Sequence, residues 1–136
     1  MSITFNPYLN FNGNTRDAME FYHQIFGGTL ELTTFGEMPD VPSIPAYKDK
    51  IMHALLQVDD ITLMATEARP DRPAVFGDNV SLSFSGTDRP KLTHYFKSLL
   101  DGGEVGMELQ PMPWGAYFGE GTDKFGVHWM VNISNE

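Results

Sequence analysis

The sequence predicts an α+β fold in which two βαβββ modules make one domain spanning residues 1–136. The first observation is an internal repeat: LNFNGNTRDAMEFYHQIF, residues 9–26, matches LSFSGTDRPKLTHYFKSL, residues 82–99, at a constant offset of 73. The second is that three strand-like runs follow each copy. The third is the proline-rich and charged stretch ARPDRPAVFGDN, which is typical of a linker. We therefore expect module one at about residues 1–68, the linker at about 69–78 and module two at about 79–136.

Each repeated segment reads as a short strand, a glycine turn and a helix. The strands LNF and LSF alternate apolar and polar residues before Gly13 and Gly86. The helices carry apolar residues at helical spacing and end at glycine pairs, which suit a left-handed helix cap. Pro90 falls in the first helical turn, where its missing N–H costs nothing. Polar N-cap candidates precede both helices: Asn14 or Thr15, and Thr87 or Asp88.

The strand-like runs that follow lie at residues 29–38, 51–60 and 61–68, and then at 104–111, 114–121 and 127–134. In the last run, alternation places Val127, Trp129 and Val131 on one face and His128, Met130 and Asn132 on the other. We expect Trp129, Phe11 and Phe84 to face the helices as core residues. Three prolines between Met38 and Lys50 predict a long irregular loop.

Composition and charge exclude several function classes. The net charge is −9 with no basic cluster, which argues against nucleic-acid binding and against anionic membranes. The chain has no cysteine, so disulfides, thiolate catalysis and zinc–thiolate sites are excluded. No signal peptide and no membrane-spanning run are recognised, and we expect a cytoplasmic protein.

The motifs NPYLNFNGNTRDAMEFYHQIFGG, FGEMP, PMPWGAYFG and TDKFGVHWMVN, with the HALLQV and ITLMATE hairpin, resemble a known family. They are similar to the PhnB-like branch of the vicinal oxygen chelate superfamily, the glyoxalase/bleomycin-resistance/dioxygenase fold. The resemblance covers nearly all of the chain. It implies an eight-stranded, cup-shaped sheet pair, often completed by a homodimer. Similar sequences also carry a ubiquinone methyltransferase description, but no glycine-rich nucleotide-binding loop is present here.

In metal-using members of that superfamily, four positions converge in the cup and usually hold histidine or glutamate. Carried onto this chain, they read Asn6, Met64, Asn79 and Met130, with Met64 aligned to Met130 at an offset of 66. Amide oxygens and thioethers suit zinc, nickel, iron or manganese poorly. We therefore predict no metal and no cofactor, and leave catalysis open, with the balance against an enzyme.

The first alternative is a metal-dependent lyase, isomerase or dioxygenase with displaced ligands. His128 and His53 would serve, with Glu37 or Glu67 as the accompanying carboxylate. The second alternative is a dimeric interaction module without catalysis. Glu120 and Asp123 form a possible carboxylate pair, but turns between strands use such residues routinely, and Asp123 is expected to cap the TDKFG turn.

The leading hypothesis is a metal-free protein that binds an unknown small organic molecule in the cup and forms a homodimer. A face with methionines, aromatic rings and scattered hydrogen-bonding groups is the usual lining of such a pocket. The predicted ligand-binding residues are Asn6, Tyr8, His53, Met64, Asn79, Ser81, Trp114, Phe118, His128 and Met130. The sequence names neither the ligand nor the way in which the modules pair.

Overall fold

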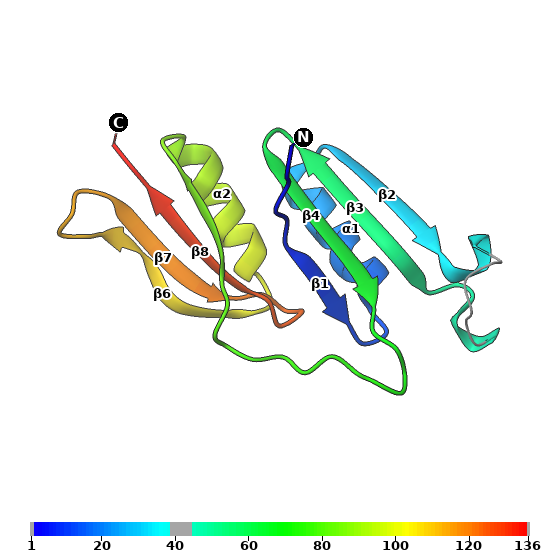
Figure 1. The fold of residues 1–136 in the computed structure, drawn as a ribbon. Helices are drawn as coiled ribbons and strands as arrows, with labels where there is room; N and C mark the ends of the chain where they lie inside the picture. Colours follow the sequence, from blue (N-terminus) through cyan, green and yellow to red (C-terminus); the bar gives the residue numbers. More distant parts are fainter. Residues whose placement is uncertain (1, 39–44, 136) are drawn as a thin grey trace. The chain divides into compact units, whose positions relative to one another are not determined.

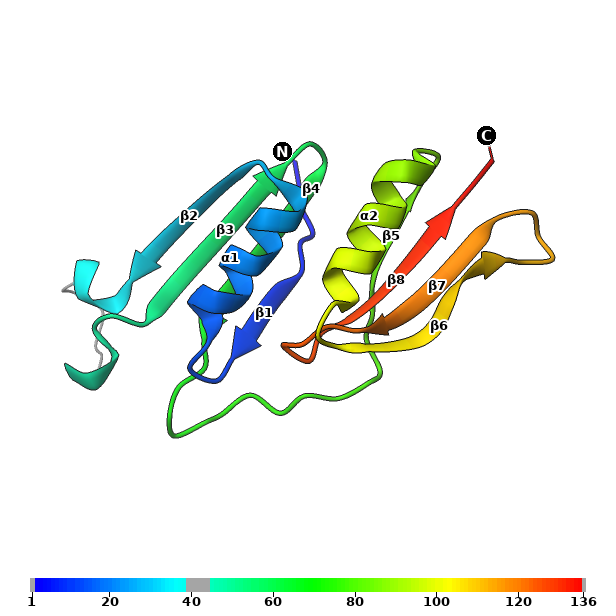
Figure 2. The same ribbon diagram turned by 180° about the vertical axis from the view of Figure 1, so that it is seen from behind.

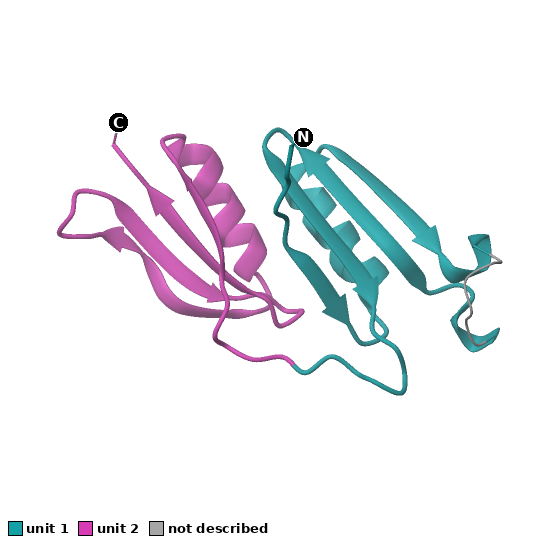
Figure 3. Cartoon of the chain, viewed as in Figure 1, with its two compact units in different colours: residues 1–75 teal, residues 76–136 magenta. Residues whose placement is uncertain are grey.

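The structure is a computed structural model that describes residues 2–38 and 45–135. The chain divides into two compact units, residues 1–75 and residues 76–136 (Figure 3). Each unit holds one helix and one four-stranded sheet (Figure 1). The α+β prediction of two βαβββ modules is confirmed.

Unit 1 follows the predicted element order closely. Its elements are β1 (Tyr8–Phe11), α1 (Thr15–Phe26), β2 (Thr29–Thr34), the short 3₁₀ helices Phe35–Glu37 and Pro45–Tyr47, β3 (Ile51–Val58) and β4 (Ile61–Glu67). The strands lie in the order β1-β4-β3-β2. β1 runs parallel to β4, whereas the other neighbours are antiparallel. The first and last strands of the module are therefore hydrogen-bonded to each other.

Unit 2 repeats this plan. Its elements are β5 (Leu82–Gly86), α2 (Arg89–Leu100), β6 (Glu104–Pro111), β7 (Tyr117–Thr122) and β8 (His128–Ile133). The strand order is β5-β8-β7-β6, with β5 parallel to β8. Of the N-cap candidates, Asp88 accepts a hydrogen bond from the Lys91 amide at 3.2 Å. Asn14 is the residue before α1 but makes no side-chain cap bond.

Each helix covers one face of its own sheet (Figure 2). In unit 1, Phe11, Met19 and Tyr22 are fully buried in the layer between helix and sheet. In unit 2, Phe84 stacks on Trp129 with the rings 5.4 Å apart and nearly parallel. Trp129 is buried and Phe84 is half-buried, so the predicted core aromatics do face the helices. Apolar side chains removed from water in this way supply the main driving force for each unit.

A buried carboxylate organises the turn before β8. Asp123 accepts hydrogen bonds from the amides of Phe125 at 2.8 Å and Val127 at 3.0 Å, and from the Trp129 indole at 2.8 Å. Its side chain is 3% exposed. The predicted turn-capping role of Asp123 is confirmed, and the same carboxylate also fixes a core tryptophan.

The linker is held at each end by the unit to which that end belongs. The Asn12 side chain donates to the Ala74 carbonyl at 3.0 Å and accepts from the Ala74 amide at 2.8 Å. At the other end, His128 Nε2 bonds the Gly77 carbonyl at 2.9 Å. Two polar side chains thus order a segment that composition alone marks as irregular.

Part of the proline-rich loop predicted from Met38 to Lys50 lies outside the described residues, at 39–44. The described flanks form 3₁₀ turns, and Phe35 and Gly36 donate backbone hydrogen bonds to Lys50 and Lys48. No helix in residues 2–38 and 45–135 has the length and apolarity needed to cross a membrane.

Candidate functional site

Each sheet has one face covered by its helix and one that is not, which we call the open face. On β8 the odd-numbered residues from Trp129 to Ile133 are buried, whereas His128, Met130 and Asn132 are half-buried. The predicted alternation along this strand is therefore confirmed. On β4 the same period places Met64 on the open face and Leu63 and Ala65 against α1.

The open face of unit 1 brings together three of the predicted site residues. Tyr8 lies opposite Met64 on the neighbouring strand. The Tyr8 hydroxyl lies 3.1 Å from His53 Nδ1, and their ring centroids are 5.8 Å apart. Partial burial raises the pKa of Tyr8, so the phenol keeps its proton at neutral pH. In the tautomer with a proton on Nε2, Tyr8 donates to His53 and the histidine presents a further donor.

The open face of unit 2 carries an aromatic corner. Trp114, in the turn between β6 and β7, approaches Phe118 edge-on with centroids 6.4 Å apart. Its indole N–H donates to Asn132 Oδ1 at 3.5 Å, and Asn132 lies opposite Phe118 in the strand register. Trp114 remains 63% exposed. A large exposed indole held in place by a second ring and an amide can stack a flat ligand.

His128 lies on the same face, but both of its ring nitrogens are engaged. Nε2 donates to the Gly77 carbonyl, which can only accept, so this nitrogen carries the proton. Nδ1 lies 2.7 Å from the Thr122 hydroxyl, which donates to it in the neutral ring. A metal would have to displace one of these bonds.

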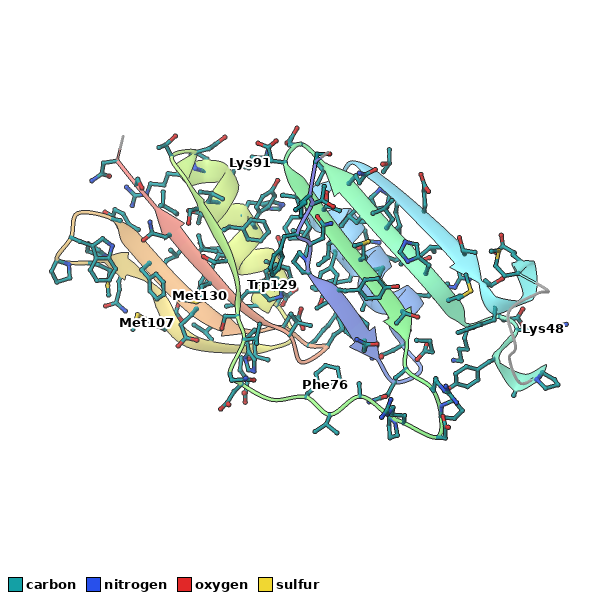
Figure 4. The ribbon with its side chains drawn as sticks, viewed as in Figure 1. Lys48, Phe76, Lys91, Met107, Trp129 and Met130 are labelled. Atoms are coloured by element: carbon teal, nitrogen blue, oxygen red, sulfur yellow. The ribbon has the colours of Figure 1, made fainter. Side chains whose placement is uncertain are left out.

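Glu120 also belongs to this face, although it is absent from the predicted ligand-binding residues. It falls in the predicted strand-like run 114–121 and lies within β7, directly opposite Met130 on β8 and Met107 on β6. Both methionines are labelled in Figure 4. Among the described residues Glu120 makes no hydrogen bond or ion pair. Alternation along the strand predicts the face on which Glu120 lies, because Phe118, Glu120 and Thr122 are two residues apart and point to the same side.

Three predicted site residues precede the first strands of the two modules. β5 begins at Leu82, so Asn79 and Ser81 precede it, and both are exposed. Asn6 likewise precedes β1, and its amide bonds Thr4 Oγ1 at 3.3 Å. The residues of β5 that face Met130 and Asn132 are Ser83 and Ser85.

The register changes one equivalence that the sequence alignment suggests. Leu9 pairs with Ala65, and its repeat partner Leu82 pairs with Trp129. Met64 therefore corresponds in position to His128, one residue before Trp129, and not to Met130. The offset of 66 aligns similar letters, whereas the parallel pairing is shifted by two residues between modules. A residue moved by two positions along a strand stays on the same face, so the alternation of side chains cannot reveal which of the two equivalences is right.

The two carboxylates considered as partners for the histidines have structural roles. Glu67 is 3% exposed on the helix side of β4 and accepts a hydrogen bond from the Gly13 amide. Glu37 bonds the amide and hydroxyl of Thr34, each at 3.0 Å, and these bonds lower its pKa. Glu67 thus faces away from His53, and Glu37 closes a capping box.

The metal-binding positions of the superfamily do not fit a divalent ion here. Across residues 2–38 and 45–135, no group of three or more histidine, aspartate or glutamate side chains is arranged to hold a metal. Even with His128 in place of Met130, the remaining donors are two amides and a thioether. Such a donor set is weak for zinc, iron or manganese.

Comparison with known proteins adds the family context. Residues 3–132 match the family model described as 3-demethylubiquinone-9 3-methyltransferase. Protein YjdN of Escherichia coli strain K12 is 33% identical over 142 residues, which cover 96% of this chain and 95% of the relative.

Solved structures extend the likeness. Protein PA1353 from Pseudomonas aeruginosa is 44% identical, with a TM-score of 0.87 and 98% of each chain covered. A PhnB protein from Bacillus cereus, which bears the same methyltransferase description, is 20% identical with a TM-score of 0.75 over 97% of this chain and 100% of that one. A glyoxalase/bleomycin-resistance/dioxygenase domain from Frankia sp. shares the fold at 13% identity and a TM-score of 0.63, with 98% of each chain covered.

Proposed function

The chain belongs to the PhnB-like family whose model carries the 3-demethylubiquinone-9 3-methyltransferase description, and on this premise we propose that it binds a small organic molecule on its open sheet faces without a metal ion. The observation that carries the proposal is the corner formed by Trp114, Phe118 and Asn132. It combines an exposed indole, a second ring and an amide, which is the mixture of apolar area and oriented polar groups found in ligand sites.

The chemistry of the face indicates the kind of ligand. Trp114 offers a flat surface for an aromatic or conjugated ring, and Met130 offers adaptable apolar contact beside it. Glu120, next to Met130, accepts hydrogen bonds only, so it favours a ligand with hydroxyl or amine donors. The open face of unit 1 offers a separate donor: with Tyr8 donating to His53 Nδ1, the histidine presents its Nε2–H. We propose a planar ring with donor substituents as the ligand class.

Methyl transfer is not part of the proposed function. A nucleotide methyl donor needs a phosphate- or ribose-binding turn, and the strand–helix turns at Gly13 and Gly86 lack the G-x-G-x-x-G pattern. We also propose that the two modules form one functional domain and that the protein is a homodimer. Ile3, Phe5 and Val75 are each more than nine-tenths exposed, and burial against a second copy would remove this apolar area from water.

Ligand binding is tested on chelator-treated protein with a panel of planar phenols and aromatic amines, monitored by thermal shift and by indole fluorescence. The affinity measured by thermal shift should fall by about fivefold or more in Trp114→Ala, since the stacking surface is worth roughly 1–3 kcal/mol. His53→Ala tests the unit 1 face, with His94→Ala on α2 as the matched control. Binding that survives Trp114→Ala unchanged would contradict the proposed site.

Metal independence needs its own measurement. Elemental analysis after incubation with zinc, nickel, iron and manganese should find far less than one equivalent bound. Near-stoichiometric metal that disappears in His128→Ala would instead support a metalloenzyme with displaced ligands. Sedimentation of wild type beside Phe5→Glu tests the homodimer, which the variant should weaken.

A further inference from the structure

A cavity of about 370 Å³ lies in unit 2 on the opposite side of the sheet from the open face, between α2 and strands β6 and β7. One wall is a single face of α2, with Arg89, Thr93 and Lys97 at successive four-residue steps. The floor is apolar, formed by Phe96, Leu109 and Ile133.

The two cations on this wall have no carboxylate partner in the described part of the chain. The ion pair found there joins Arg69 to Asp71, both of which belong to unit 1. Arg89 and Lys97 make no ion pair with described residues, although Glu108 also lines the cavity. In a chain with 9 basic and 18 acidic residues, two unpaired cations on one small cavity are an unusual concentration of positive charge.

Arg89 is held in a defined orientation. Its guanidinium lies over the Tyr117 ring, 3.9 Å from the centroid. Stacking occupies the flat face of the guanidinium and leaves its N–H edge free to donate. An edge of this kind matches a carboxylate with two parallel hydrogen bonds.

We propose that this cavity binds a small organic monoanion, a carboxylate with an apolar body. The carboxylate bonds the edge of Arg89, and the apolar body lies along Phe96 and Leu109 toward the ammonium of Lys97. Glu108 at the far wall disfavours a second negative charge. The site is independent of the open face: Tyr117 and Phe118 are neighbours in β7 and point to opposite sides of the sheet.

The test is a titration of ¹⁵N-labelled protein with benzoate and hexanoate, each compared with its neutral amide at matched ionic strength. The proposal predicts saturable amide shifts at Thr93 and Lys97 with the carboxylates and none with benzamide or hexanamide. Arg89→Gln should weaken benzoate binding at least tenfold. Arg89→Lys, which keeps the charge but loses the stacked fork, should weaken it severalfold.

One further variant and one check of folding keep the outcome unambiguous. Trp114→Ala removes the proposed open-face site and should leave the benzoate titration unchanged, so failure of one site is distinguishable from failure of the other. The dispersion of the amide spectrum shows whether each variant is folded. Equal responses to benzoate and benzamide, or an unchanged titration in folded Arg89→Gln, would overturn the proposal.

Discussion

The Asp123 carboxylate offers a quantitative test of how unit 2 is stabilised. Its three observed donors are two backbone amides on one oxygen and the Trp129 indole on the other. Asp123→Asn keeps the shape and one oxygen, but it turns an N–H₂ group toward the buried indole N–H. The loss of a charge-assisted bond together with a buried, unsatisfied donor should cost about 2–4 kcal/mol of the free energy of unfolding.

A double-mutant cycle with Trp129→Phe isolates the indole contribution. Phenylalanine has no N–H, so Asp123→Asn in that background should lose only about 1 kcal/mol, from the weaker acceptor toward the backbone amides. The expected coupling between the two sites is therefore about 1–3 kcal/mol, above the additivity limit of roughly 0.5 kcal/mol.

Urea unfolding followed by far-ultraviolet circular dichroism measures the four variants, and near-ultraviolet signal checks that unfolding is two-state. Asp78→Asn is the matched control, since Asp78 is exposed and should shift stability by less than about 0.5 kcal/mol. A coupling below that limit would refute the view that Asp123 acts through Trp129.

Three other predictions concern the backbone and titration. Gly28→Ala should destabilise unit 1 by more than about 2 kcal/mol, because the backbone φ of Gly28 is +78° and a Cβ would lie 2.2 Å from the Gln57 carbonyl oxygen. Gly115→Ala is the control in the same denaturation assay: φ is +92° there but the space is open, so the cost should be only about 1 kcal/mol. Tyr8 should ionise above the ordinary tyrosine pKa in a 295 nm titration, read as wild type minus Tyr8→Phe, and ionisation at the ordinary value would contradict the effect of its burial. The stability linked to its raised pKa is present below the ordinary tyrosine pKa and lost as pH rises through the raised value. The pKa of Glu37, measured by carboxyl NMR, should lie below that of an ordinary glutamate, and Thr34→Val should return it toward the ordinary value. The stability that Glu37 contributes to the turn is present above the ordinary glutamate pKa and is lost as pH falls through the lowered pKa.

The helices and strands could be predicted from the sequence because hydrophobic periodicity and helix-ending glycines are local features. Both helices end beside the glycines that mark them, and β8 buries Trp129 and Val131 as alternation requires. These features depend on side chains a few residues apart, which the printed sequence lists in order.

The site was less predictable because register and partner choice depend on contacts distant in sequence. Met64 corresponds to His128 only after the parallel pairs are seen, and alternation cannot detect a shift of two residues. Glu120 has neighbours on two other strands, Met107 and Met130, and the sequence does not list these residues beside it. The stacking of Arg89 on Tyr117 joins residues from α2 and β7, and no spacing rule links them.

The parallel pairing of first and last strands also determines when each module can fold during synthesis. Tyr8 finds its partner Met64 only after β4 has left the ribosome, so the first sheet cannot close earlier. In the second module β8 lies between β5 and β7, and until it emerges both of those strands present unpaired edges. A ribosome that stalls before His128 therefore leaves a chain whose first module is finished and whose second is exposed to aggregation and to quality-control proteases.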